Sequence, residues 1–209
     1  RTFRLAMSDY GAALLLPGLV RALREQAPGI DLAITHASRE GMQEGVLSGE
    51  IDLAAGVFPD LPAELRSTPL FQEHYACLVD RDSLPAEGVL DLPTYLARPH
   101  VLLEVRGSGT PEIERALTAI RCRRHVAVSL PHWSVAPHLI GGTDLILTVA
   151  SRGLRGIDDP GLAVVGPPFS IPNFNFVLAW HERRGGDPAL NWLNGQIEQV
   201  SGRVPQAQR

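Results

Sequence analysis

Apolar and polar positions along the first 60 residues alternate between two periods, one typical of strands and one typical of helices. The leucines of the first long segment recur at helical spacing, and Pro28-Gly29 follows them as a stop signal. A second, shorter helical stretch ends at Gly49. The pattern predicts strands at 3–8, 30–37 and 51–57, with helices at 9–27 and 39–49 between them. This order predicts a parallel sheet with right-handed crossovers.

The same rhythm returns later in the chain, after a long extended segment at 67–83. It predicts strands at 100–105, 125–130 and 144–149, helices at 110–120 and 132–142, extended segments at 161–169 and 174–181, and a last helix at 187–200. A βαβαβ pattern that occurs twice, with extended connectors between, indicates an α/β protein of two similar lobes around a hinged cleft. Ligands of open parallel sheets bind beyond the carboxyl ends of the strands.

The composition of the chain excludes several classes of function. The chain has 209 residues, is 44% hydrophobic and carries a formal net charge of −4, which is typical of a globular domain without a nucleic-acid-binding surface. No apolar run reaches the roughly 18 residues of a membrane helix. All 19 basic residues are arginine, which excludes a Schiff-base lysine and a P-loop lysine.

Five blocks of sequence, taken in order, carry a resemblance to a known family. They are "RLAMSDYGAALLLPGLVRALREQAPGIDLAI", "LSGEIDLAAGVFPDLP", "PLFQEHYACLV", "LPHWSVAPHLIGGTDLILTVASR" and "AWHERRGGDPALNWLNGQI". Together they resemble the effector-binding domain of LysR-type transcriptional regulators over nearly the whole chain. The ending "WH…DPALNWL" is most similar to the branch that holds regulators of aromatic catabolism and nodulation.

The resemblance implies two Rossmann-like lobes joined by two crossover strands, as in periplasmic binding proteins of type II. Lobe I would comprise 1–79 plus 173–209, and lobe II 80–172. The winged helix-turn-helix that binds DNA in the family is absent from this chain. One departure is that Ile120-Arg121 stand where relatives usually carry a glycine, so the resemblance does not predict the local turn geometry.

Several candidate site residues follow the predicted strands of the first lobe. Ser8 occupies the family's common effector position, where a hydroxyl and free helix-start amides suit a carboxylate or phenol oxygen, although a plain helix cap explains it equally well. Thr35 and His36 end the second strand. Among the aromatic residues, Phe58 is favoured for a ligand over the core, whereas the alternation in "NFNFVL" favours the core for Phe174 and Phe176.

In the second lobe, the resemblance places the loop "GSGTP" at the cleft, with Thr110 near an effector contact where some relatives have histidine. His132 matches a cleft residue of the aromatic-catabolism branch, and a packed helix-start histidine is the alternative. Trp133 is favoured for the core. Arg106, Arg152 and Arg155 are weaker candidates for an anionic effector because exposed arginines on loops are common. The predicted effector-binding residues are Ser8, Asp9, Tyr10, Thr35, His36, Phe58, Gly109, Thr110, His132, Trp133 and Phe174.

No catalytic or metal motif is found. His132 and His138 point about 120° apart on a helix, and neither a G-x-S-x-G elbow nor a zinc motif occurs. We therefore expect no enzyme, no metal and no cofactor. We expect a cytoplasmic effector-sensing domain that binds a small organic ligand, such as an aromatic acid or a phenol, and forms a homodimer or tetramer. The alternative is a periplasmic solute-binding protein of the same architecture.

Overall fold

The computed structural model describes residues 1–85, 87–103 and 112–203. The chain divides into two compact units, and it passes from one to the other twice. Unit 1 comprises Arg1–Gln72 and Phe174–Arg209, and unit 2 comprises Glu73–Asn173. Each unit is built around a five-stranded sheet, which confirms the α/β class.

Unit 1 has a mixed sheet in the order β2-β1-β3-β10-β4. β1 pairs in parallel with β2 and β3, whereas β10 pairs antiparallel with β3. The elements of unit 1 are β1 (Thr2–Met7), α1 (Asp9–Gln26), β2 (Asp31–Thr35), α2 (Arg39–Ser48), β3 (Leu53–Gly56), β4 (Leu65–Glu73), β10 (Phe174–His181), the 3-10 helix η4 (Glu182–Arg184) and α5 (Pro188–Arg203).

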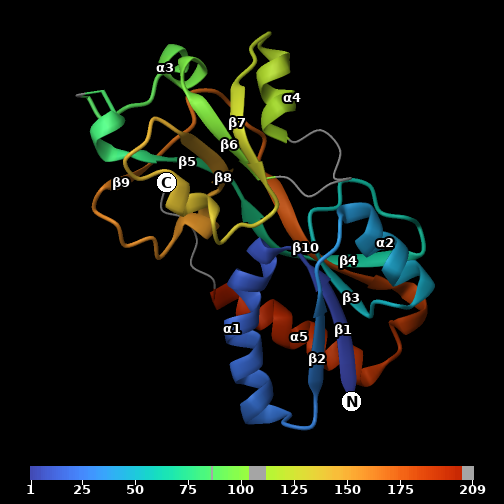
Figure 1. Ribbon diagram of the computed structural model, residues 1–209. Helices are drawn as coiled ribbons and strands as arrows, with labels where there is room; N and C mark the ends of the chain where they lie inside the picture. The colour runs from blue at the N-terminus through green and yellow to red at the C-terminus, as the bar shows by residue number, and fades with distance from the viewer. Residues whose placement is uncertain (86, 104–111, 204–209) are drawn as a thin grey trace. The chain divides into compact units, whose positions relative to one another are not determined.

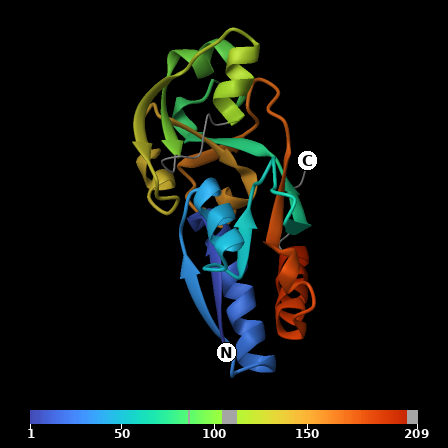
Figure 2. The same ribbon diagram turned by 90° about the vertical axis from the view of Figure 1, so that its right-hand side faces the viewer.

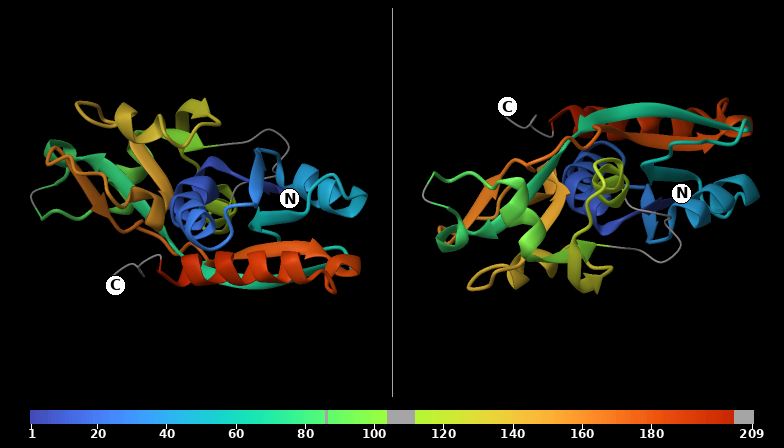
Figure 3. Two further views of the ribbon diagram at one scale, coloured as in Figure 1. Left: turned by 90° about the horizontal axis from the view of Figure 1, so that it is seen from below. Right: turned by 90° about the horizontal axis from the view of Figure 1, so that it is seen from above.

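Two helices cover one face of this sheet and a third helix covers the other. α1 and α5 lie side by side (Figures 1 and 2) and bury leucines against Phe3, Leu5 and Phe176. α5 runs along β10 and β4 (Figure 3), and the Ser201 hydroxyl donates a hydrogen bond to the Leu70 carbonyl at 3.3 Å. α2 packs on the opposite face, where strand positions are small, such as Ala6 and Ala54. The parallel strand ends of unit 1 thus sit on a sheet packed on both faces.

Unit 2 repeats this order with its own strands, β7-β6-β8-β5-β9. β6 pairs in parallel with β7 and β8, and β5 pairs antiparallel with β8 and β9. Its elements are β5 (Tyr75–Asp80), η1 (Arg81–Ser83), α3 (Leu92–Ala97), β6 (Pro99–Leu103), α4 (Glu112–Ala119), β7 (His125–Leu130), η2 (Ala136–Leu139), β8 (Ile146–Ala150), η3 (Ser151–Leu154) and β9 (Leu162–Val165).

The two faces of the unit 2 sheet are covered by different kinds of helix. α3 and α4 pack over Cys77, Val79 and Ile146, with Tyr95 of α3 fully buried among them. The short 3-10 helices η2 and η3 cover the other face, around Leu78 and Leu147. One face of unit 2 is therefore closed by single helical turns where unit 1 has a full α-helix.

The expected lobe boundary at residue 79 differs from the observed division. Glu73 and the whole of β5 lie in unit 2, because β5 pairs with β8 and β9 of that unit. The extended segment predicted at 67–83 is thus two strands that belong to different sheets, followed by η1.

Two helical segments of unit 2 differ from the sequence prediction. The helix predicted at 132–142 is reduced to η2, which has Pro137 in its first turn and the positive-φ residue Gly142 beyond its end. The second segment, α3, was not predicted; it has only six residues and follows the cap residue Asp91. The Asp91 carboxylate accepts a hydrogen bond from the Thr94 backbone N–H at 2.7 Å.

Candidate functional site

The carboxyl ends of β1 and β2 in unit 1 bring four predicted residues to one edge of the sheet. Ser8 follows β1 and caps α1: its side-chain oxygen accepts a hydrogen bond from the Gly11 backbone N–H at 3.3 Å. Thr35 is the last residue of β2 and pairs with Ala6, two positions before Ser8. The edge therefore presents two hydroxyls beside the first turn of α1, where backbone N–H groups favour anions.

Asp9 and His36 add an acid and a base to the same edge. The Asp9 Oδ1 lies 3.8 Å from the His36 Nδ1, and both side chains are partly exposed. This separation is longer than a hydrogen bond but allows ionic attraction when the imidazole is protonated. Ser8, Asp9, Thr35 and His36 thus form the strand-end cluster of unit 1.

The aromatic residues of unit 1 divide between the core and its margin. Phe176 is buried, stacks on Phe71 with ring centroids 5.1 Å apart, and meets Tyr10 edge-on at 5.7 Å. A Cβ on Gly11 would lie 2.8 Å from the Phe176 ring, so this glycine makes room for it. Tyr10 is half-buried against this core, and Phe174, the first residue of β10, is also half-buried.

The structure places Phe58 in the core, whereas its position after a strand end predicted a ligand contact. Its side chain is only 9% exposed and belongs to the apolar cluster around Met42 and Val46. A Cβ on Gly56 would come within 3.2 Å of the Phe58 ring. The glycine at the end of β3 therefore accommodates an aromatic core residue.

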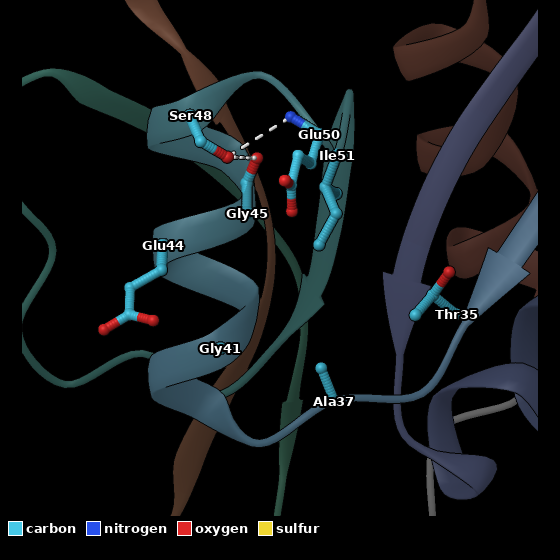
Figure 4. Close-up of a pocket in the computed structure, with 8 residues that line it drawn as sticks. All are labelled: Thr35, Ala37, Gly41, Glu44, Gly45, Ser48, Glu50 and Ile51. Carbon is cyan, nitrogen blue, oxygen red and sulfur yellow. Dashed lines mark hydrogen bonds between the residues drawn. The ribbon is translucent and has the colours of Figure 1, made fainter.

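A hollow of about 490 Å³ lies beside α2 in unit 1. Figure 4 shows Thr35 and Ala37 on one side of this hollow and α2 on the other, with Glu50 and Ile51 following the helix. Thr35 is the one predicted residue among its eight lining residues. Because Glu44 and Glu50 contribute carboxylates to the lining, the hollow is poorly matched to an organic acid.

In unit 2, His132 and Trp133 follow the carboxyl end of β7. His132 is exposed and Trp133 is half-buried. A Cβ on Gly153 would lie 2.0 Å from the Trp133 ring, so the indole packs directly on the turn that follows β8. Gly109 and Thr110, the other two predicted residues of this unit, lie outside the described residues.

Sequence reasoning missed a buried charged cluster at the same edge of unit 2. Glu73 is 1% exposed, and its carboxylate accepts hydrogen bonds from the Ser151 hydroxyl and the His74 backbone N–H, each at 2.8 Å. Arg152, treated above as an exposed loop residue, is only 5% exposed and ion-paired with Glu73. The available signal was a glutamate within the segment "PLFQEHYACLV", which the pattern predicts to be extended.

A second set of buried polar groups lies under α3 and α4. The Thr148 hydroxyl contacts the Tyr95 hydroxyl at 3.0 Å and the Cys77 sulfur at 3.4 Å. Burial raises the pKa of the Cys77 thiol to about 11 and that of the Tyr95 hydroxyl to about 12. A thiol with so high a pKa stays protonated near neutral pH, which disfavours a nucleophilic role.

Two further results limit the chemistry. Among the residues that the structure describes, no three histidine, cysteine, aspartate or glutamate side chains come together as metal ligands. Within residues 1–85, 87–103 and 112–203, no helix combines the length and apolarity needed to cross a lipid bilayer.

Two known proteins of similar sequence are both regulators of transcription by name. The chain is 30% identical over 194 residues to the HTH-type transcriptional activator NahR of Pseudomonas putida and 30% identical over 194 residues to the activator NagR of Ralstonia sp. Each match covers 92% of this chain, which spans only 65% of NahR and 64% of NagR.

A solved structure similar to this chain also comes from a transcriptional activator. The regulatory domain of MexT, a transcriptional activator in Pseudomonas aeruginosa, superposes with a TM-score of 0.83 at 32% identity. The superposition covers 95% of this chain and 97% of that domain. The model of a protein family described as "LysR substrate binding domain" matches residues 1–201. Because this match extends over nearly all of the 209 residues, the chain belongs to the family of LysR substrate-binding domains.

Proposed function

We propose that this chain is the effector-sensing domain of a transcriptional regulator and that it binds a small organic ligand without changing it chemically. The observation that carries the proposal is the strand-end cluster of Ser8, Asp9, Thr35 and His36 in unit 1. It combines hydroxyl groups, an acid–base pair and the first turn of α1 at the edge where open α/β sheets bind ligands. NahR, NagR and MexT, which this chain resembles, are named as transcriptional activators.

Ser8 is the residue on which the proposal is tested. Its oxygen accepts from Gly11 N–H, so its own hydrogen remains available for a carboxylate or phenolate oxygen of a ligand. Ser38 is a matched control in the same unit. It caps α2 with nearly the same backbone angles, and its oxygen accepts from the Gly41 N–H at 3.1 Å.

The experiment is calorimetric titration of the chain with aromatic acids and phenols, using Ser8→Ala and Ser38→Ala. Each substitution removes one helix cap, so both variants should lose about 1 kcal/mol of stability. Ser8→Ala should also weaken ligand binding by roughly tenfold, the equivalent of one hydrogen bond to a charged group, while Ser38→Ala should bind normally. Equal affinities for the two variants would remove Ser8 from the site.

Absence of chemical change is tested on the same ligands. After prolonged incubation with the chain, the ligand should be recovered unaltered by chromatography and mass spectrometry. A product that accumulates in proportion to protein concentration would instead make the chain an enzyme.

The alternative considered from the sequence, a periplasmic solute-binding protein, is disfavoured by the comparisons, since the relatives named above are transcriptional activators. The coding sequence upstream of Arg1 distinguishes the two. A regulator should have a helix-turn-helix domain there, which would bind DNA in place of the residues described above. A charged and apolar segment that ends in small residues would support export and transport.

For the partners of the chain, we propose self-association through the exposed edge strands. β2 ends the sheet of unit 1 and β7 ends the sheet of unit 2. Ile34 on β2 is 41% exposed, and Val20 on α1 is exposed as well. An unpaired edge with apolar side chains is a ready surface for a second copy.

Light scattering of the purified chain tests this association. Ile34→Glu should shift the chain toward monomer, whereas Val89→Glu, at a loop position that is 64% exposed, should leave its mass unchanged. A wild-type chain that is monomeric at calorimetric concentrations would contradict the proposal. In the regulator, an effector would act only through its different affinities for two conformations of this assembly.

A further inference from the structure

The chain passes between the two units along β4 and β10, and each of these strands carries a phenylalanine close to the point of passage. The first segment of unit 1 ends at Gln72, one residue after Phe71. The second segment begins at Phe174, two residues before Phe176. We infer that the Phe71–Phe176 pair couples the effector site at Ser8 to both connecting strands. The inference rests on the proposed function, because it concerns the regulation of that same site.

Phe71 and Phe176 join β4 and β10 by stacking their rings. The two strands are neighbours in the sheet of unit 1. The ring centroids are 5.1 Å apart, and the ring planes differ by only 4°. Phe176 is 2% exposed, so its ring lies within the close-packed core of the unit. In such a core, a displacement of one ring requires a displacement of the ring that is stacked on it.

The same Phe176 ring supports the first turn of α1. The Tyr10 ring meets it edge-on, with the centroids 5.7 Å apart. A Cβ on Gly11 would lie 2.8 Å from the Phe176 Cζ, which is closer than van der Waals contact, so the ring packs directly on the Gly11 backbone. The Gly11 N–H in turn donates a hydrogen bond to the Ser8 Oγ at 3.3 Å. One glycine therefore connects Ser8 to the stack.

The stack lies at the edge of the sheet where the strand-end cluster is found. Val177, the residue after Phe176, pairs with Gly56, the last residue of β3. β3 pairs in parallel with β1, whose carboxyl end directly precedes Ser8. Because the Phe176 ring packs on Gly11, a shift of the first turn of α1 toward the sheet displaces this ring. An effector that favours one position of the turn therefore also favours one packing of the stack.

Calorimetric titration with benzoate, phenylacetate and phenol tests the link between Ser8 and Phe176. Gly11→Ala should weaken the binding of the tightest of these probes by roughly tenfold, because the added methyl group displaces the turn from the Phe176 ring. The matched control is Gly18→Ala on the same helix, where an added Cβ would lie 2.7 Å from the Val200 Cγ1. Gly18 lies about two helical turns further on, so this variant should bind within about twofold of the wild type.

Two double variants show whether Gly11 acts through its neighbours. In Ser8→Ala, the further change Gly11→Ala should not weaken binding again, because the hydroxyl that it displaces is already gone. Additive losses would show that Gly11 acts elsewhere. Combined with Phe176→Leu, Gly11→Ala should regain the wild-type affinity, since leucine lacks the ring atom that the new methyl group meets. Binding that stays weak would show that Gly11 does not act through this ring.

Hydrogen exchange measured by mass spectrometry tests the coupling to the connecting strands. In the wild type, saturation with the tightest probe should slow exchange at least about threefold in the peptides that cover β4 and β10. Phe176→Leu should still bind the probe but lose this slowing, because the stack is broken. The control is Phe3→Leu, the same change at a fully buried residue near the amino end of β1. Phe3→Leu should keep the slowing.

The outcomes separate the coupling from the proposed function. If Phe176→Leu keeps the slowing, or if the wild type shows none, the role of the stack is wrong while effector sensing stands; this holds even where Gly11→Ala does not fold. If Gly11→Ala folds and binds as the wild type does, the link from Ser8 to Phe176 is wrong. If no probe binds the wild type, or if Ser8→Ala binds normally, the proposed site at Ser8 fails and takes the inference with it.

Discussion

Units 1 and 2 have the same strand order but fill their interiors differently. In both, a first strand pairs in parallel with the second and third, and an antiparallel strand then pairs with the third. That antiparallel strand comes from a distant part of the chain in unit 1 and from the strand entering the unit in unit 2. The topology therefore does not decide which side chains fill the core.

The core of unit 1 around Phe176 is apolar, and the main ionic cluster of this unit joins the buried Asp52 to two arginines. There Asp52 accepts hydrogen bonds from Arg4 and Arg184, whose guanidinium groups are partly exposed. Hydrogen bonds from these arginines lower the pKa of Asp52 against the opposing effect of its burial. In unit 2 the buried polar groups include an imidazole: Glu73, His100 and Thr148 are all buried. We therefore expect the stability of unit 1 to depend mainly on apolar packing, and the stability of unit 2 to depend also on the protonation of His100.

Phe176→Ala should produce the largest effect, in unit 1. It removes a buried ring that stacks on Phe71 and packs on Gly11, so we expect a loss of about 3–5 kcal/mol in urea unfolding. Phe71→Ala is the control, because Phe71 belongs to the same stack but is only half-buried and should cost clearly less. Equal losses would mean that the stack, and not the depth of burial, sets the stability of this core.

Acid should act on unit 2 through His100, which is fully buried and donates a hydrogen bond from Nε2 to the Tyr95 carbonyl at 2.8 Å. Burial lowers the pKa of His100 from 6.5 to about 4. The folded chain therefore keeps this imidazole neutral while the unfolded chain takes up a proton below pH 6.5. Stability is complete above that pH and should fall by about 3 kcal/mol as the pH drops toward 4.

Urea unfolding at pH 7 and pH 4.5 measures this loss. His100→Gln can still donate to the Tyr95 carbonyl but cannot take up a proton, so its stability should depend less on pH. Phe176→Ala should keep the wild-type pH dependence, because it changes only the apolar packing of unit 1. A pH dependence unchanged in His100→Gln would place the acid-sensitive group elsewhere.

The sequence predicted unit 1 better than unit 2 because the signals of unit 1 are local. α1 was expected at 9–27 and is found at Asp9–Gln26, and α2 ends at Gly49 as predicted. Ser8, Ser38 and Gly49 mark these ends within one helical turn. In unit 2, α3 is too short to show a helical period, and Pro137 limits η2 to a 3-10 turn.

The sequence could predict candidate site residues only where they lie at or next to the ends of predicted strands. Ser8 and His36 were predicted because each lies at the end of a predicted strand, and the structure places both at one edge of the sheet of unit 1. Phe58 also follows a strand, but its packing depends on Met42 and Val46, which the strand pattern does not reveal. The pairing of Glu73 with Arg152 joins positions 79 residues apart in the chain, so no local pattern reports it.

The smallest expected effect concerns the left-handed residue that follows a helix in each unit. Gly49, directly after α2 of unit 1, has φ 82°, whereas Arg121, two residues after the end of α4 in unit 2, has φ 57°. Cys122 N–H donates to the Leu117 carbonyl and Arg121 N–H to the Thr118 carbonyl, both at 2.9 Å, which is the geometry that favours glycine. Left-handed backbone costs a residue with a side chain about 1–2 kcal/mol. The greater entropy of glycine in the unfolded chain offsets about 0.5–1 kcal/mol of the stability gained when glycine replaces such a residue.

Arg121→Gly should therefore raise the stability in urea by up to about 1 kcal/mol, while Gly49→Ala should lower it by about as much. Arg121→Ala separates the loss of the arginine side chain from the backbone effect, and a glycine variant less stable than this alanine variant would show that Arg121 is not strained.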